Sequence, residues 1–419
     1  MKIAFFCPHS DPLARPGEPD AGGQCVYEAR IARALAELGH EVRAYTRLWA
    51  DKPADEPLCP GATVHRFPMG PGGFLRKEDM GPYLPEFAGR VLSSPQRAWL
   101  NGADVLHGHY WDGGAAAAMA SLSTGRPLVF TSHSLGRVKR ERVPDPSDDG
   151  STYNYHVRIP AEGRIMAAAD AIIALSQMER DVLVDGYGVA PERIRIIPGG
   201  VDVDYYAPEA SKDELKARLG LSQTLLGFTV GRLDPRKGFV ELLEALPRVA
   251  ERLQALGQSL RFFVPGGPPQ LSPEEAEYRK RLETRVSELG LDATVELFPR
   301  LSQERLRDYY QAADVFVCPS PYEPFGLVVI EAFAAGTPVV ATAFGGPPEV
   351  ISPGVDGYLA DPSHAEELAQ AILAVLERPK GERATMGEAA LAKAHKRYAW
   401  TAVAAGIAKV YEGLPAPRG

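Results

Sequence analysis

Two glutamates, Glu323 and Glu331, frame the segment of this chain with the clearest chemical character. The residues between them open with a proline and a glycine and continue as an aliphatic run. This pattern predicts a buried helix with one carboxylate just before it and the other two turns inside it. Free N–H groups at a helix start attract phosphate, and carboxylates accept hydrogen bonds from sugar hydroxyls. The segment therefore predicts a pocket for a molecule with a pyrophosphate centre and hydroxyl-rich ends, and a nucleotide-sugar fits that description.

Two cations, Arg232 and Lys237, lie in the glycine-flanked segment 231–238. We expect Arg232 to end a strand and Lys237 to start a helix, so that both can point at one ligand. Two fixed cations could neutralise a diphosphate as it leaves, which would be electrostatic catalysis. The alternative is a solvated charge cluster on the surface, and the flanking glycines favour a built loop instead.

A third candidate is His133, which follows an apolar run and is expected at the carboxyl end of a strand. That position favours a site residue over a structural one, because ligands of doubly wound sheets bind at this edge. His107 and His109 lie at a similar strand end, and we interpret them as packing residues or as supports for residues 110–112.

Loops rich in glycine precede two predicted helices. Residues 20–24 lie between the first strand and the first helix, where glycines allow close backbone approach to a ligand. An ordinary loop is the alternative. Dinucleotide binding is disfavoured, because there is no G-x-G-x-x-G and the second strand ends in Thr46 and Arg47 instead of an acid. Residues 345–349 are either a second ligand-approach loop or a simple turn.

A set of basic residues clusters in two stretches with little regular pattern, 70–98 and 136–155, and just beyond them. Such insertions in an α/β domain tend to carry binding residues. These cations could bind an acidic acceptor or could form an ordinary basic surface. They are Lys77, Arg137, Lys139, Arg140, Arg142 and Arg158.

Strand and helix signals alternate along the whole chain and restart after residue 208, which predicts two doubly wound, parallel α/β domains. We expect a first domain over 1–205 and a second over 206–399, with a last helix near 400–415 that can pack back on the first. Two such domains face to face would enclose a central cleft. Strands are predicted at 3–7, 41–46, 105–107, 128–131, 171–174, 194–197, 226–230, 261–264, 294–297, 315–318 and 338–342, and helices at 26–38 and 239–256.

Composition narrows the functional class. The 419 residues suit roughly two domains, and a net charge of −8 argues against a nucleic-acid partner. No apolar run approaches the roughly 18–20 residues needed for a membrane span. The nine histidines show no metal-ligand spacing, and the four cysteines show no C-x-x-C pairing. We therefore expect free thiols, a cytoplasmic location, and neither a metal nor a cofactor.

Taken together, these motifs resemble the retaining glycosyltransferases of family 4, which have the two-domain GT-B fold. The most specific parts are the cation pair, the two glutamates within 320–331, and residues 345–349. Within the family, segments 20–24, 76–87, 107–112 and 132–136 look similar to sucrose-phosphate synthase and mannosylfructose-phosphate synthase. Enzymes that glycosylate inositol phosphate on the way to a thiol share a similar N-terminal plan.

The resemblance implies a role for each matching residue. The diphosphate would be held by Arg232 and Lys237, Glu323 would contact the donor sugar, and His133 would lie near the reacting centre. These four are the implied catalytic residues. The implied donor-binding residues are Gly23, Arg300, Phe325, Gly326, Leu327 and Glu331, with Glu331 on the ribose. The implied acceptor-binding residues are Gln24, which lines the acceptor side together with Gly23, and Lys77, Lys139 and Arg158 for the acceptor phosphate.

The activity implied is transfer of a hexosyl unit, with retention, from a nucleoside-diphosphate sugar such as UDP-glucose to fructose 6-phosphate, giving sucrose 6-phosphate. Ala21 and Val157 depart from the pattern, and Val157 replaces an arginine typical of sucrose-phosphate synthases. Mannosylfructose-phosphate synthesis or another family-4 transfer, a nucleotide-sugar 2-epimerase and a non-catalytic nucleotide-sugar-binding protein are the alternatives. The expected partners are small-molecule substrates alone, for a monomer or a homodimer.

Overall fold

The computed structural model describes residues 1–14, 22–49, 51–142, 147, 152–268, 270–323 and 325–417. The chain divides into two compact units, one formed by Met1–Gly199 with Trp400–Gly419 and the other by Gly200–Ala399. The division falls a few residues before the expected boundary at 205. The last helix belongs with the first unit.

The first unit contains an eight-stranded sheet in the order β3-β4-β2-β1-β5-β6-β7-β8. Every neighbouring pair is parallel except β3 with β4. Both β3 and β4 were missing from the sequence prediction. The strands are β1 (Lys2–Phe6), β2 (Glu41–Arg47), β3 (Asp55–Cys59), β4 (Ala62–Phe67), β5 (Val105–His109), β6 (Leu128–Thr131), β7 (Ala171–Ala174) and β8 (Ile194–Ile196).

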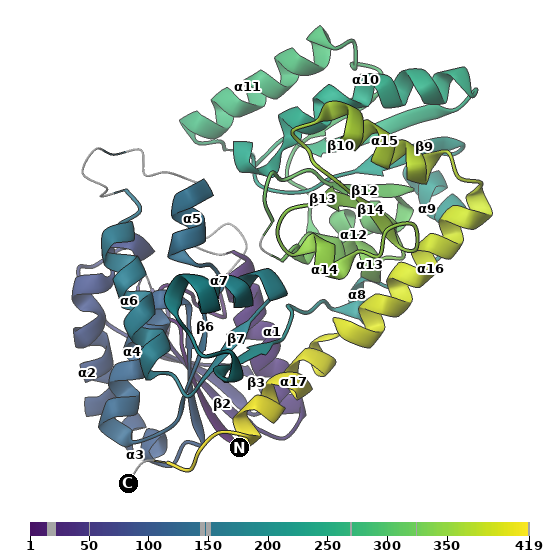
Figure 1. Ribbon diagram of the computed structural model, residues 1–419. Coiled ribbons are helices and arrows are strands. Elements are labelled where there is room, and N and C mark those ends of the chain that lie inside the picture. Colours follow the sequence, from purple (N-terminus) through teal and green to yellow (C-terminus); the bar gives the residue numbers. More distant parts are fainter. Residues whose placement is uncertain are drawn as a thin grey trace. The chain divides into compact units, whose positions relative to one another are not determined.

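Helices cover both faces of this sheet (Figure 1), and each face has its own apolar core. One core joins the sheet to α2, α4 and α6, and the other joins it to α1 and α17. The helices of the unit are α1 (Gly23–Glu37), η1 (Lys77–Asp79), η2 (Gly81–Tyr83), α2 (Leu84–Ser93), α3 (Gln96–Asn101), α4 (Tyr110–Thr124), α5 (Gly136–Arg142), α6 (Tyr155–Ala168), α7 (Gln177–Tyr187), η3 (Pro191–Arg193) and α17 (Trp400–Glu412).

Helix α2 corrects the prediction that residues 70–98 lack regular structure. Its apolar residues Leu84, Phe87, Ala88 and Val91 have the spacing of one helix face, and all four are buried. The proline in its first turn is compatible with a helix start. Burial of this face therefore fixes the segment as a helix against α4.

The second unit contains a six-stranded, fully parallel sheet in the order β11-β10-β9-β12-β13-β14. One core joins it to α10, α11 and α15, and the other joins it to α8, α12, α13 and α16. The strands are β9 (Thr224–Phe228), β10 (Ser259–Pro265), β11 (Val295–Phe298), β12 (Val315–Cys318), β13 (Val339–Thr342) and β14 (Gly357–Ala360). The helices are α8 (Val203–Tyr206), α9 (Lys212–Arg218), η4 (Pro235–Lys237), α10 (Phe239–Ala255), α11 (Pro273–Glu288), α12 (Gln303–Ala312), α13 (Leu327–Ala334), α14 (Pro347–Val350), α15 (Ala365–Leu376) and α16 (Lys380–Arg397).

Each sheet reverses its strand order once, between β1 and β5 in the first unit and between β9 and β12 in the second. Ligands of doubly wound sheets bind beyond the carboxyl ends of the strands at such reversals. The loops that follow β1, β5 and β6 in one unit, and β9, β12 and β13 in the other, are therefore where binding residues should lie.

Candidate active site

Lys237 and Glu323 form an ion pair beside the strand reversal of the second sheet. The Nζ of Lys237 donates to Oε2 of Glu323 at 3.0 Å. Burial by itself would lower the pKa of Lys237, but the carboxylate of Glu323 and smaller contributions outweigh it and raise that pKa. The ammonium therefore stays charged at neutral pH, and it keeps further N–H donors for an anion.

Two glycines bring these side chains together, because each allows a backbone contact that a side chain would block. Gly238 has φ +69°, and a Cβ there would lie 1.9 Å from the carbonyl oxygen of Pro319. Gly345 has φ +104°, and a Cβ there would lie 2.0 Å from the carbonyl oxygen of Glu323. The N–H of Gly346 donates to that same oxygen at 2.9 Å. The loop after β13 therefore holds the backbone of Glu323 in place.

Helix α13 (Leu327–Ala334) begins four residues after Glu323, and its first N–H groups have no partner within the helix. Gly326 provides the left-handed turn into the helix, with φ +88°. Phe325 is buried and its ring packs on Tyr398 at 6.1 Å between centroids. Phe325, Gly326 and Leu327, predicted together as donor-binding residues, thus form one anchored helix start. Pro324 lies outside the described residues.

Glu331 lies inside α13 and is half-buried. Burial raises the pKa of its carboxyl to about 7, although hydrogen bonds with the hydroxyls of Tyr310 and Tyr206 oppose that rise. The Tyr310 hydroxyl donates to Oε2 at 2.9 Å. Near neutral pH this group can therefore exist in either protonation state, and a donor such as a ribose hydroxyl would favour the ionised one.

The other two cations predicted in this unit, Arg232 and Arg300, are exposed. Strand β9 ends at Phe228, so Arg232 lies in the loop beyond the strand, and Lys237 closes the short helix η4 instead of starting α10. The expected strand-end and helix-start positions are therefore wrong by a few residues. Arg300 follows β11, and its backbone N–H donates to the carbonyl oxygen of Gly267 at 2.6 Å.

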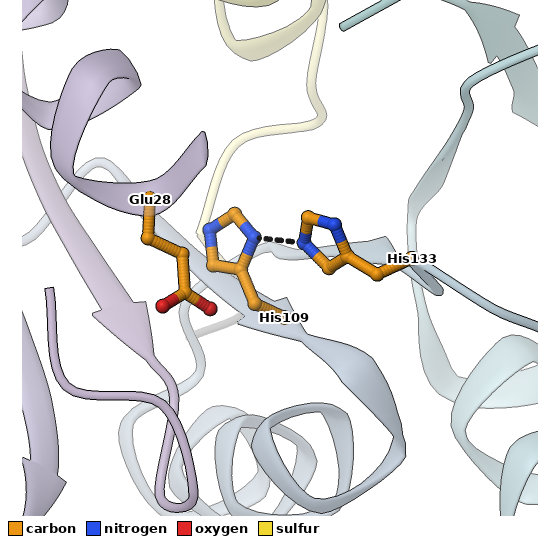
Figure 2. A group of neighbouring side chains, drawn as sticks. All are labelled: Glu28, His109 and His133. Carbon is orange, nitrogen blue, oxygen red and sulfur yellow. Dashed lines mark hydrogen bonds between the residues drawn. The ribbon is translucent and has the colours of Figure 1, made fainter. Parts of the chain in front are cut away.

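In the first unit, three side chains from separate elements meet at the strand reversal (Figure 2). His109 is the last residue of β5, His133 follows β6, and Glu28 lies in α1. His109 Nδ1 and His133 Nε2 are hydrogen-bonded at 2.9 Å, and His109 lies between the other two side chains. One ligand atom from each of the three residues lies within 4.8 Å of the others, so the group has the donors to hold a metal ion.

The two histidines of this cluster are uncharged at neutral pH. Burial lowers the pKa of His133 to about 3 and holds the pKa of His109 well below its usual value. Burial also raises the pKa of Glu28 well above its usual value. The carboxyl of Glu28 accepts hydrogen bonds from the Ser10 hydroxyl at 2.6 Å and from the side-chain amide of Gln24 at 2.8 Å. Gln24, predicted on the acceptor side, is therefore oriented by Glu28.

The neighbouring loop is only partly described. Gly23 is the first residue of α1 and is exposed. Asp20 and Ala21, which complete the predicted glycine-rich motif, lie outside the described residues.

Lys77 and Lys139, predicted to hold an acceptor phosphate, converge on one carboxylate. Lys77 begins η1 and Lys139 lies in α5, yet the Nζ atoms of both lie 4.0 Å from Oε1 of Glu78. Lys139 also lies over the ring of Tyr153, at 4.5 Å from its centroid. Two stretches of chain far apart in sequence thus bring two cations together.

Arg158 lies deeper than an open phosphate-binding cation would. Only 3% of the residue is exposed. Its Nε donates to Oε1 of Glu162 at 2.7 Å, its Nη2 donates to the carbonyl oxygen of Ser134 at 2.5 Å, and its guanidinium lies over the Tyr110 ring at 4.5 Å. Its Nη1 makes no hydrogen bond with the residues that the structure describes.

A groove of about 740 Å³ is lined by residues of α4, of α6 and of the segment 75–85, which includes Glu78. Its walls are mostly apolar. Val157 is 42% exposed and lines this groove beside Trp111. The position where sucrose-phosphate synthases tend to have an arginine is therefore part of an apolar wall in this chain.

The sequence matches two family descriptions that together span most of the chain. Residues 21–205 match "Glycosyltransferase Family 4", and residues 211–393 match "Glycosyl transferases group 1". The chain is also 35% identical over 424 residues to a D-inositol 3-phosphate glycosyltransferase of Acidothermus cellulolyticus, covering 100% of this chain and 91% of that protein. This chain is a family-4 glycosyltransferase.

Two further proteins are similar to this glycosyltransferase. A mannosylfructose-phosphate synthase of Agrobacterium fabrum is 33% identical over 423 residues, covering 98% of this chain and 91% of the relative. The solved structure of sucrose-phosphate synthase from Thermosynechococcus elongatus matches with a TM-score of 0.81 and 31% identity, covering 98% of each chain. The two α/β units with their mostly parallel sheets thus have the GT-B fold, as the sequence predicted.

The glycosyltransferase has further polar residues at this edge that its sequence motifs did not indicate as site residues. His9 follows β1, and its Nδ1 lies 2.9 and 3.0 Å from the two carboxylate oxygens of Asp112, a fully buried residue. Glu28 and His109 are two more. The sequence could have indicated His9 and His109 as site residues, because they lie at the ends of two central strands. Nothing in the sequence distinguishes Glu28 from a surface glutamate.

None of the helices in the described part of the chain has both the length and the apolar character needed to cross a membrane.

Proposed function

We propose that this family-4 glycosyltransferase transfers a hexosyl unit from a nucleoside-diphosphate sugar to a phosphorylated sugar or polyol, with retention of the anomeric configuration. The observation that carries the proposal is the convergence of Lys77 and Lys139 on Glu78, with 4.0 Å from each Nζ to the same oxygen. Two cations held at one point suit a phosphate group, which can displace the carboxylate from both.

The second unit supplies the donor site. Lys237 and Arg232 would bind the leaving diphosphate together with the N–H groups at the start of α13. Glu323, already oriented by Lys237 and by the loop after β13, would accept hydrogen bonds from the donor sugar. Glu331 would bind the ribose. The exposed segment at Arg300 would lie by the base, mainly through its backbone.

The reaction proposed needs no covalent enzyme intermediate. The bond between the anomeric carbon and the diphosphate oxygen breaks as the acceptor hydroxyl forms a new bond to the same face of that carbon. The proton of that hydroxyl passes to the leaving diphosphate. Charge that develops on the diphosphate is stabilised by fixed cations and helix-start donors, which need no reorganisation during the reaction.

Two acceptors have specific support. Fructose 6-phosphate with UDP-glucose, giving sucrose 6-phosphate, is supported by the match to sucrose-phosphate synthase at a TM-score of 0.81. An inositol phosphate is supported by the 35% identity to an inositol 3-phosphate glycosyltransferase. Val157, in place of an arginine typical of sucrose-phosphate synthases, weakens the case for fructose 6-phosphate. Both acceptors carry the phosphate that the two lysines would bind, as does the product named in mannosylfructose-phosphate synthase.

The test is a matrix of UDP-, ADP- and GDP-sugars against phosphorylated and free sugars and polyols, with products identified by mass and NMR. The proposal predicts a disaccharide phosphate or a glycosylated polyol phosphate. Turnover of the donor without any acceptor, with an epimerised sugar as product, would instead indicate a nucleotide-sugar 2-epimerase. Binding of nucleotide-sugars without turnover of any combination would indicate a non-catalytic binding protein.

A further inference from the structure

His109 makes one polar contact in the described chain, and that contact is with His133. His109 is fully buried, and only its Nδ1 is bonded, at 2.9 Å to His133 Nε2. Its Nε2 is buried and has no hydrogen-bond partner among the described residues. His133 has the left-handed φ of +54°, which is uncommon for a residue other than glycine. His133 thus combines an uncommon backbone conformation with a hydrogen bond from a histidine that makes no other polar contact among the described residues.

The surroundings hold the ring of His109 in one orientation. It packs against His107 at 4.1 Å and edge-on against Phe5 at 4.6 Å between centroids. His107 is itself bonded on both nitrogens, to the Tyr411 hydroxyl at 2.6 Å and to the Thr131 hydroxyl at 2.8 Å. The ring of His133 contacts the ring of Tyr27 edge-on, at 4.9 Å between centroids. The bond between the two histidines is therefore made by rings that have little freedom to turn.

Which of the two histidines donates the hydrogen in this bond can be decided by comparing the two possible arrangements. Both imidazoles are neutral, because burial lowers both pKa values. If His133 donated, His109 would have its own proton on the buried Nε2 and leave an N–H without an acceptor. If His109 donates from Nδ1, its Nε2 is a bare lone pair. Buried N–H groups without an acceptor are rarer than buried acceptors without a donor, so His109 is the donor.

We propose that His109 is a positioning residue, whose Nδ1–H donates to Nε2 of His133 and so fixes His133 in the tautomer that carries its proton on Nδ1. His133 then offers an N–H donor, at a fixed position, to an oxygen of a bound substrate. This second step rests on the proposed function, because it requires a sugar substrate as ligand. The first step is a property of the protein alone.

The direct test is the histidine spectrum of the ¹⁵N-labelled full chain, read through long-range couplings without any substrate. The proposal predicts that His133 carries its proton on Nδ1. A spectrum with the proton of His133 on Nε2 would overturn the proposal, whether or not the enzyme transfers sugars. A failure of the proposed function would appear separately, as an absence of turnover in the wild-type protein.

Two substitutions at His109 separate a positioning role from simple packing. In His109→Asn, the side-chain amide can take the place of Nδ1 and keep the donor, whereas in His109→Gln it reaches toward the place of Nε2. We expect kcat within about threefold of wild type for the first and a loss of about 10–100-fold for the second. Binding of the nucleoside diphosphate should not change in either variant.

His107→Asn is the matched control, because His107 lies on the same strand, is equally buried and makes no hydrogen bond to His133. Thermal unfolding of all three variants measures the loss of packing. Equal kcat values for His109→Asn and His109→Gln would overturn the proposal. So would a loss of kcat in His107→Asn as large as that in His109→Gln, because packing alone would then explain the effect.

Discussion

Replacing Gly345 by alanine should misplace Glu323 and cost both activity and stability. A Cβ at this position would lie 2.0 Å from the carbonyl oxygen of Glu323, whereas ordinary contacts begin near 3.4 Å. The two backbones must therefore separate by about 1.4 Å, the difference between these distances. That shift breaks the 2.9 Å hydrogen bond from the N–H of Gly346.

The expected loss of stability is the sum of two ordinary terms. A φ of +104° costs a residue other than glycine roughly 1–2 kcal/mol, and the lost hydrogen bond costs about 1 kcal/mol. The unfolding free energy of Gly345→Ala should thus fall by about 2–3 kcal/mol in urea titrations. Because a misplacement of about 1 Å at a reacting centre can cost about 10²-fold in rate, kcat/KM should fall by about that factor.

Gly354→Ala provides the control. Gly354 has φ +80°, but a Cβ there meets nothing closer than the Tyr358 hydroxyl at 4.0 Å. This variant should lose only the conformational term, about 1–2 kcal/mol, and keep kcat/KM within about twofold. If both variants have the same kcat/KM, the loop after β13 does not position Glu323 and the reasoning is refuted.

Three further substitutions test other parts of the site. Lys237→Ala should lower kcat by about 10²-fold or more, whereas Arg236→Ala, at an exposed residue bonded to its neighbour Asp234, should change it less than threefold. Lys139→Met should raise KM for a phosphorylated acceptor about tenfold, whereas Arg140→Met on the same short helix should leave it unchanged. The pKa of Glu331 lies near 7 in the folded state and near 4.3 in the unfolded state, so the folded state binds more protons between these pH values. The free energy of unfolding should therefore decline by about 1–3 kcal/mol as pH rises from 4.5 to 7. Glu331→Gln should remove that decline in urea titrations at pH 5 and pH 8.

Much of the fold could be predicted because parallel strands buried on both faces are nearly continuous apolar runs. Strands β6, β7 and β12 were predicted with the bounds that the structure shows. Strand β3 was missed because its sequence is Asp-Glu-Pro-Leu-Cys, in which only Leu58 is buried. Such a strand lies at the sheet edge, where its partner β4 and not its own apolar pattern determines its conformation.

The grouping of the proposed donor-binding residues was more predictable than that of the proposed acceptor-binding residues. Glu323, Lys237 and the start of α13 belong to compact motifs that one strand reversal brings together. Lys77 and Lys139 belong to separate insertions, and only the folded chain shows that both reach Glu78. A pattern of single residues cannot reveal such a contact, because the distance depends on how two irregular segments pack.

The buried cluster around His133 shows a different limit. The sequence indicated that His133 is a site residue, but it assigned His109 to packing or to support of residues 110–112. The missing information was the burial of Glu28, whose neighbours in α1 give no sign that its carboxyl is enclosed. Charge state and hydrogen-bond direction follow from burial, and burial was not visible in the sequence.

The central claim is that the acceptor is recognised through its phosphate. The most direct measurement is kcat/KM for the best acceptor found in the matrix, compared with the same acceptor without its phosphate. Two charge-assisted contacts of about 1.5–3 kcal/mol each predict a ratio of about 10²–10⁴ in favour of the phosphorylated form. A ratio near one would contradict the claim, and the convergence of Lys77 and Lys139 on Glu78 would then be structural.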